Sequence, residues 1–150
     1  MNNRKANGEP FSIEEIEKEI TEEFELFGED WESKYEHLIE LGKSLPLIEE
    51  KYKTEDRLIK GCQSRVWMHS KLKDGKVLYT ADSDAIITKG MVALMIRVLS
   101  GQTPEDILKA DLAFIDKIGL KEHLSPTRAN GLVSMIKQMK LDAKALSLKV

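Results

Sequence analysis

The chain has 150 residues, of which 41% are hydrophobic and 33% are charged, and its net charge is −3. This composition is typical of one globular domain and excludes an intrinsically disordered chain. The weakly acidic balance, without a basic block, argues against nucleic acid or an anionic membrane as the main partner.

Two helices are predicted in the first third of the chain. Residues 1–10 are rich in Asn, Gly and charge, and we expect them to form a flexible tail ahead of a single domain over 11–150. Ser12 and Glu15 form a capping box, and apolar residues then recur at helical spacing as far as Phe27. Asp30 is the expected cap of a second helix.

The middle of the chain predicts a hairpin. Residues 49–60 are polar and are expected to form a surface connection. Apolar and polar residues alternate over 66–72, Asp-Gly at 74–75 is a strong turn signal, and 76–81 make a return strand. A two-stranded hairpin is only marginally stable alone, so we expect a third strand at 57–60.

Helices are expected to fill the rest of the chain. Acidic residues and a serine at 82–84 are predicted to open a helix whose continuation, 85–99, is apolar on every side and therefore buried. Short helices are predicted after Thr103 and over 111–118, and Ser125 caps a long final helix. We expect the inner stripe of that helix to contain Leu132, Val133, Ile136 and Met139. The order of elements predicts an α+β fold, with a small antiparallel sheet of about three strands packed against several α-helices.

Cys62 is the only cysteine of the chain. A single thiol excludes an intramolecular disulfide, a dithiol redox pair, and the several sulfur ligands of an iron–sulfur cluster or of a structural zinc site. Cys62 lies between a glycine and the predicted strand, where a sulfur can be presented rather than packed. The residues alone leave two readings open, an inert buried thiol and a reactive one.

Hydrolytic and metal chemistry have little support. A cysteine hydrolase needs a histidine base, and none of His37, His69 and His123 stands in a recognisable catalytic context. One chemistry needs only a single sulfur: a thiolate attacks the outer sulfur of a partner's persulfide and keeps that atom as its own persulfide.

The run GCQSRVW at 61–67 resembles the GCQSQVW run of SufE-type sulfur acceptors. Four further segments resemble the family in the same order: WESKY at 31–35, IELGKSLP at 39–46, DSDA at 82–85 with KG at 89–90, and LSPTR at 124–128 with GL at 131–132. The resemblance extends over about residues 11–140. It implies a fold shared with cluster scaffolds of the IscU type.

The resemblance also implies a function. SufE proteins accept sulfur from a PLP-dependent cysteine desulfurase of the SufS type, stimulate that enzyme, and pass the sulfur to a SufBCD scaffold for iron–sulfur cluster assembly. The chain would then be an accessory protein rather than an enzyme, with no metal and no cofactor of its own, because PLP belongs to the partner. Its oligomeric state, monomer or homodimer, stays open. One cysteine and an N-terminus without the apolar core of a signal peptide favour the cytosol.

The resemblance assigns candidate site residues. Cys62 matches the acceptor cysteine, and Arg128 matches an arginine expected to stabilise the thiolate or the persulfide. The loop and docking candidates are Gly61, Gln63, Ser64 and Asp84.

Three functional hypotheses follow for this chain. They are a sulfur acceptor, a regulator that stimulates a desulfurase by docking alone, and a cluster scaffold, which the missing ligands disfavour. Arg65 departs from the family glutamine, and the related CsdE branch carries arginine there in the run GCENRVW. The recipient of the sulfur is therefore less defined than the acceptor role.

Overall fold

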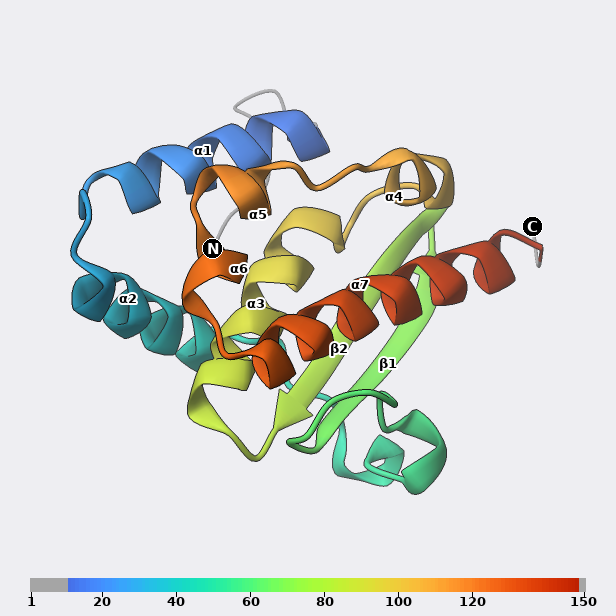
Figure 1. Cartoon of the computed structure of the whole chain (residues 1–150). Coiled ribbons are helices and arrows are strands. Elements are labelled where there is room, and N and C mark those ends of the chain that lie inside the picture. Colours follow the sequence, from blue (N-terminus) through green and yellow to red (C-terminus); the bar gives the residue numbers. More distant parts are fainter. Residues whose placement is uncertain (1–10, 149–150) are drawn as a thin grey trace.

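Helices surround a two-stranded antiparallel sheet in the computed structural model of the chain, which describes residues 11–148. The predicted tail over residues 1–10 lies outside the described part. Figure 1 shows the hairpin at the right of the view, with α7 crossing in front of it and α3 to its left. The elements are α1 (Ile13–Glu25), α2 (Trp31–Lys43), β1 (Val66–Lys73), β2 (Lys76–Ser83), α3 (Ile86–Leu99), α4 (Pro104–Lys109), α5 (Phe114–Lys117), α6 (Leu120–His123) and α7 (Pro126–Ser147), with 3₁₀ turns at Glu50–Tyr52 and Glu55–Arg57.

The predicted caps of the first two helices are present. Ser12 Oγ accepts from Glu15 N–H at 3.1 Å, and the Glu15 carboxylate accepts from Ser12 N–H at 3.2 Å. Asp30 caps α2 by accepting from Ser33 N–H at 3.3 Å. Phe27, expected on the first helix, instead lies in the turn that follows α1.

The predicted hairpin is confirmed, but the prediction of a third strand at 57–60 is wrong. Asp74 and Gly75 both have positive φ, as a two-residue hairpin turn of the I′ type requires. Residues 57–60 contribute only an isolated bridge between Leu58 and Trp67, beside a hydrogen bond from Ile59 N–H to the carbonyl of Val66 at 2.9 Å. The 3₁₀ turn at Glu55–Arg57 occupies the residues that a longer strand would need.

The central helix α3 begins later than the sequence pattern predicts. Asp82 and Ser83 end β2, where Asp82 pairs in register with Trp67. The Asp82 carboxylate also holds Lys53 Nζ at 2.8 Å and Lys89 Nζ at 3.3 Å, which joins the 49–60 connection to the sheet and to α3. These contacts fix Asp82 on the strand, so it does not cap α3.

Helix α3 forms the core and contacts both α1 and α2. A Cβ at Gly90 would lie 2.2 Å from the backbone oxygen of Leu38, and a Cβ at Gly42 would lie 3.1 Å from Gly90 N. The backbones of α2 and α3 therefore touch directly at this crossing.

A charged cluster ties α3 to α1. Arg97, whose side chain is 5% exposed, donates to Glu19 at 2.6 Å and to Glu23 at 2.9 Å. His37 of α2 bonds Glu23 at 3.1 Å. Burial opposes ionisation of Glu23, but the hydrogen bonds and charge of Arg97 outweigh it and lower the pKa of this carboxyl. The buried guanidinium is thus compensated, as a charge in a core must be.

The long helix α7 packs against the sheet, and its buried stripe differs from the predicted one. Leu132, Met135, Met139 and Ala143 are fully buried and form its inner stripe. Val133 was expected among them but is 50% exposed, because it projects from the other side of the helix. Ile136 is half-buried.

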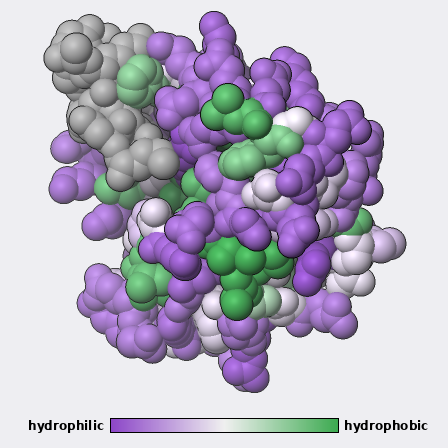
Figure 2. Space-filling view, turned by 90° about the vertical axis from the view of Figure 1, so that its left-hand side faces the viewer, coloured by the Kyte–Doolittle hydropathy of each residue, from purple (hydrophilic) through white to green (hydrophobic). Residues whose placement is uncertain are grey.

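One face of the molecule is mostly polar. Figure 2 shows one face dominated by hydrophilic residues, with hydrophobic ones in separate islands. Within residues 11–148, no helix combines the length and the apolar character needed to cross a bilayer.

Candidate functional site

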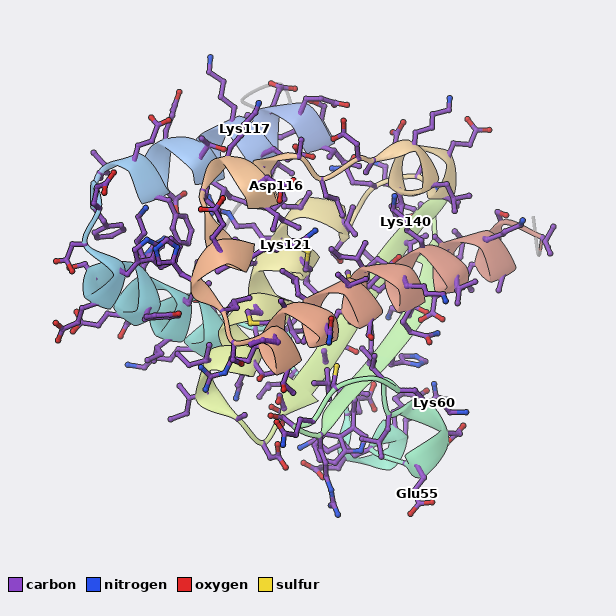
Figure 3. The ribbon with its side chains drawn as sticks, viewed as in Figure 1. Glu55, Lys60, Asp116, Lys117, Lys121 and Lys140 are labelled. Carbon is purple, nitrogen blue, oxygen red and sulfur yellow. The ribbon has the colours of Figure 1, made fainter. Side chains whose placement is uncertain are left out.

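Cys62 lies in the short loop that joins the 49–60 connection to β1. The thiol is free and half-buried. Glu55 and Lys60, on the segment before the loop, extend away from the body of the molecule (Figure 3). Gly61 begins the cysteine loop, and its φ of +94° lies in the region that favours glycine.

The loop is seated on α7 by two close approaches. A Cβ at Gly61 would lie 2.3 Å from Ser134 Oγ, so the loop backbone packs directly against that side chain. The Cys62 thiol points at the carbonyl oxygen of Gly131, with Sγ at 3.6 Å. A Cβ at Gly131 would lie 3.5 Å from the same sulfur. This is an ordinary van der Waals distance, so the thiol rests directly on the surface of the helix at Gly131.

The loop is also held at its other end. Arg65 N–H donates to the Asp84 carboxylate at 3.1 Å, and Asp84 N–H donates to the carbonyl oxygen of Arg65 at 3.3 Å. Asp84 therefore lies beside the end of the cysteine loop and does not line the cavity at the thiol. Its position suits a residue that fixes the path of the loop.

The thiol opens into a cavity of about 330 Å³ between the loop, α3 and α7. Its walls include Cys62, Thr88 and Met91 of α3, and Arg128, Gly131 and Met135 of α7. Burial in this partly apolar setting raises the pKa of the Cys62 thiol. The resting sulfur is therefore protonated at neutral pH, and it needs help to become a nucleophile.

Arg128 brings positive charge to the mouth of the cavity. It lies in the first turn of α7, where its N–H donates to Ser125 Oγ at 3.3 Å, and its side chain is exposed. Within the described residues, its guanidinium has no ion-pair or hydrogen-bond partner. The start of a helix adds the positive end of its dipole, so the mouth favours an anion.

Gln63 and Ser64 line the same cavity from the loop side. Gln63 is exposed and Ser64 is half-buried. Neither side chain makes a hydrogen bond to another residue of the part that the structure describes. A role for these two side chains in docking therefore stays a prediction.

The histidines lie in other settings. His37 bonds Glu23, His69 stacks on Tyr52 with its ring centroid 3.9 Å away, and His123 stacks on Trp31. Within residues 11–148, no group of three or more His, Cys, Asp or Glu side chains could hold a metal ion. The site therefore offers a single sulfur and a cavity with a positive charge at its mouth.

Sequence reasoning missed Ser134, Thr88 and Met135 as site residues. Nothing in their local sequence marks them, because each reaches the cysteine loop only through the packing of α3 and α7. Gly131 carried a signal that went unused, since a glycine inside a helix often marks a close approach.

Replacing Gly61 by alanine should destabilise the protein and expose the thiol. The positive φ sets most of the cost and the contact with Ser134, whose hydroxyl can rotate, adds to it, so we expect a loss of about 2 kcal/mol in the free energy of unfolding. Urea denaturation and the rate of Cys62 alkylation measure the two effects, and the alkylation rate should rise.

Gly75→Ala is the matched control for Gly61→Ala. Gly75 has a φ of +77°, but a Cβ there would meet nothing within 4 Å, so only the backbone term remains, about 1 kcal/mol. Equal losses in the two variants would show that Ser134 does not hold the loop.

The family described as "SufE: Fe-S metabolism associated domain" matches residues 18–143. SufE-like protein 1 of Arabidopsis thaliana, named as chloroplastic/mitochondrial, is 38% identical over 141 residues; the match covers 92% of this chain but only 38% of that protein. An uncharacterized SufE-like protein of Rhizobium meliloti is 39% identical, over 84% of this chain and 93% of that protein.

A third relative and a solved structure agree with these matches. An uncharacterized SufE-like protein of Synechocystis is 41% identical, over 79% of this chain and 75% of its own length. The solution structure of a hypothetical protein from Thermus thermophilus superposes with a TM-score of 0.74 at 22% identity, covering 89% of this chain and 96% of that chain. At that identity the superposition establishes the α+β fold alone.

Proposed function

The chain belongs to the SufE family of iron–sulfur metabolism, and from this premise we propose that Cys62 accepts a sulfur atom from a cysteine desulfurase and carries it as a persulfide. The observation that supports this most directly is the setting of the thiol. Cys62 is a lone cysteine that opens into a cavity, and the arginine at the mouth of this cavity has no partner within residues 11–148.

The proposed step conserves atoms and charge. The donor presents a cysteine persulfide, and the Cys62 thiolate attacks its outer sulfur. The bond between the two donor sulfurs breaks as a new bond forms between the outer sulfur and Cys62 Sγ. The donor leaves as a thiolate, and Cys62 becomes the persulfide.

The raised pKa of Cys62 gives docking a role in this step. The thiol must lose its proton before it attacks, and burial opposes that loss. A docked partner that opens the loop, or anion stabilisation by Arg128, would lower the cost. The same burial keeps the resting thiol away from other electrophiles.

The remaining assignments complete the proposal. The donor is a SufS-type desulfurase that supplies its own PLP, and the chain itself has no cofactor. The recipient is a SufBCD-type scaffold; a CsdE-like branch with another recipient is the alternative, which Arg65 favours and Gln63-Ser64 disfavour. We place the protein in the cytosol, although one relative is named as chloroplastic/mitochondrial.

Mass spectrometry of the intact wild-type protein tests the proposal. After incubation with its desulfurase and cysteine, the chain should gain the mass of one sulfur atom, and a thiol reductant should remove it. Digestion should place the added sulfur on the peptide that contains Cys62. A protein that stays unmodified while it still stimulates the desulfurase would instead favour a regulator that acts by docking alone.

Replacing Arg128 by glutamine should slow sulfur uptake about three- to tenfold, because the site loses its positive charge. The effect is no larger because the Arg128 side chain is exposed, so solvent screens its charge. Arg128→Lys should retain part of the rate. The second-order rate of persulfide formation on Cys62 is the measurement.

Arg65→Gln is the matched control for Arg128→Gln. Arg65 is an exposed arginine of the cysteine loop, but it does not line the cavity. Equal slowing in the two variants would mean that overall charge, and not the position of Arg128, controls the rate.

A further inference from the structure

Thr88 stands apart among the buried polar side chains. The described residues contain four that are polar or charged and buried: Lys34, Thr88, Arg97 and Gln102. Three have partners: Lys34 Nζ lies 4.6 Å from the centre of the Trp31 ring, Arg97 binds two glutamates, and Gln102 donates to the carbonyl oxygen of Phe11 at 2.9 Å. The Thr88 hydroxyl alone makes no hydrogen bond within residues 11–148.

The helix itself does not satisfy this hydroxyl. A threonine inside a helix commonly donates to the carbonyl one turn earlier, as Thr21 does to Glu17 at 2.8 Å. Thr88, in the first turn of α3, makes no such bond. Its hydroxyl is left available although the residue is only 6% exposed.

The hydroxyl must reach open space. In the described part of the chain, no side-chain oxygen or nitrogen that is fully sealed from solvent lacks a hydrogen-bond partner. The unpaired Thr88 oxygen is therefore not sealed, and the space that Thr88 lines is the cavity next to Cys62. A hydroxyl that faces this space bonds water at rest, and it can donate instead to a group that enters the cavity.

The charge of the cavity indicates what it binds. Helices α3 and α7 both begin beside it, with Thr88 and Arg128 in their first turns, so two positive dipole ends meet there. The walls otherwise include the apolar side chains of Met91 and Met135. A small, polarisable anion suits this combination better than a neutral polar ligand does.

We propose that the Thr88 hydroxyl donates a hydrogen bond to the outer sulfur of the persulfide on Cys62, and so acts as a positioning residue for the carried sulfur. This inference rests on the proposed function. A persulfide places its outer sulfur about 2 Å beyond Cys62 Sγ, and the cavity is the space into which it extends. A persulfide is a stronger acid than a thiol, so its outer sulfur gives its proton to solvent and accepts the hydrogen bond as an anion.

The hydrogen bond has a consequence for the lifetime of the carried sulfur. A thiol reductant attacks the outer sulfur more readily when that sulfur is protonated than when it is an anion, because like charges repel. Thr88 keeps the outer sulfur anionic, and so protects it until a recipient docks. Thr88→Val replaces the hydroxyl by a methyl group of similar size, and Thr88→Ser keeps the hydroxyl.

The experiment loads the persulfide chemically, so that it does not depend on any desulfurase. Cys62 is first converted to a mixed disulfide with thiopyridine, and sulfide then displaces the pyridine thiolate and leaves Cys62 as the persulfide. The rate of persulfide alkylation is measured against pH, and the persulfide that survives in a fixed concentration of a small thiol is measured by mass spectrometry.

Thr88→Val should move the midpoint of the alkylation profile upward by about 0.5–1 pH unit, because the anion loses a hydrogen bond. It should also shorten the survival of the persulfide about three- to tenfold. Thr88→Ser should match the wild type in both measurements. Wild-type behaviour of Thr88→Val would overturn the inference.

A stability measurement tests whether the role of Thr88 is purely structural. Thr88→Val without sulfur should be at least as stable to urea as the wild type, since the hydroxyl has no protein partner to lose. Marked destabilisation by valine but not by serine would reveal such a partner and would also overturn the inference. Failure of the proposed function has a different signature: the desulfurase would not load the wild type, whereas the Thr88 effect on the chemically loaded protein would remain.

Discussion

Cys62→Ser should abolish sulfur acceptance completely. Serine preserves the shape of the side chain but supplies no thiolate, and Cys62 is the only cysteine of the chain, so no other residue can take over. The intact mass should then stay unchanged after incubation with the desulfurase and cysteine. Because the thiol is half-buried and makes one weak hydrogen bond to Gly131, the unfolding midpoint should change little.

The same variant separates the acceptor from the docking regulator. If stimulation of the desulfurase depends on removal of its sulfur, Cys62→Ser should leave the enzyme at its basal rate even though the variant still binds. Full stimulation by Cys62→Ser would refute the acceptor as the source of stimulation. Binding measured directly, by titration calorimetry, confirms that an inactive variant has docked.

Gly90→Ala should be the most destabilising single methyl addition in the described core. In a free helix alanine is favoured over glycine by about 1 kcal/mol. Here the new Cβ would lie 2.2 Å from the backbone oxygen of Leu38 and 2.7 Å from its carbonyl carbon, and backbone atoms cannot rotate away. The helices α2 and α3 must separate, and we expect a net loss of about 2–4 kcal/mol in urea denaturation.

Gly42→Ala is the control for Gly90→Ala on the facing helix. Its Cβ would lie 3.1 Å from Gly90 N, a tight contact that a small shift can relieve. We expect a loss about half as large or smaller. If Gly90→Ala were as stable as the wild type, the close crossing of α2 and α3 would be wrong.

Local signals predicted most of the fold. The caps at Ser12 and Asp30 and the Asp74-Gly75 turn depend on neighbouring residues only, and each is present. The third strand was wrong because the chain at 57–60 makes a 3₁₀ turn and a single bridge, a choice that depends on packing. The placement of Val133 was wrong because helical spacing alone does not say which of two adjacent apolar residues faces the sheet.

Fewer residues of the site than of the fold could be predicted from the sequence. The run around Cys62 identifies the sulfur, and the family resemblance adds Arg128 and Asp84. Contacts between segments that are distant in the sequence leave no local motif from which they could be predicted. Ser134 against Gly61, and Thr88 in the cavity, come together only when α3 and α7 pack beside the cysteine loop.

The short bridges beside the hairpin limit how other chains can attach to it. On the β1 edge, Ile59 bonds Val66. On the β2 edge, Ala81 exchanges hydrogen bonds with Pro46 and Ile48, and Val77 exchanges them with segment 101–102. An incoming strand would have to displace these bonds on the β2 edge, but among the described residues the bonds on the β1 edge involve only its beginning, at Val66 and Trp67. A partner that adds a strand to the sheet is therefore limited to the part of β1 that follows Trp67.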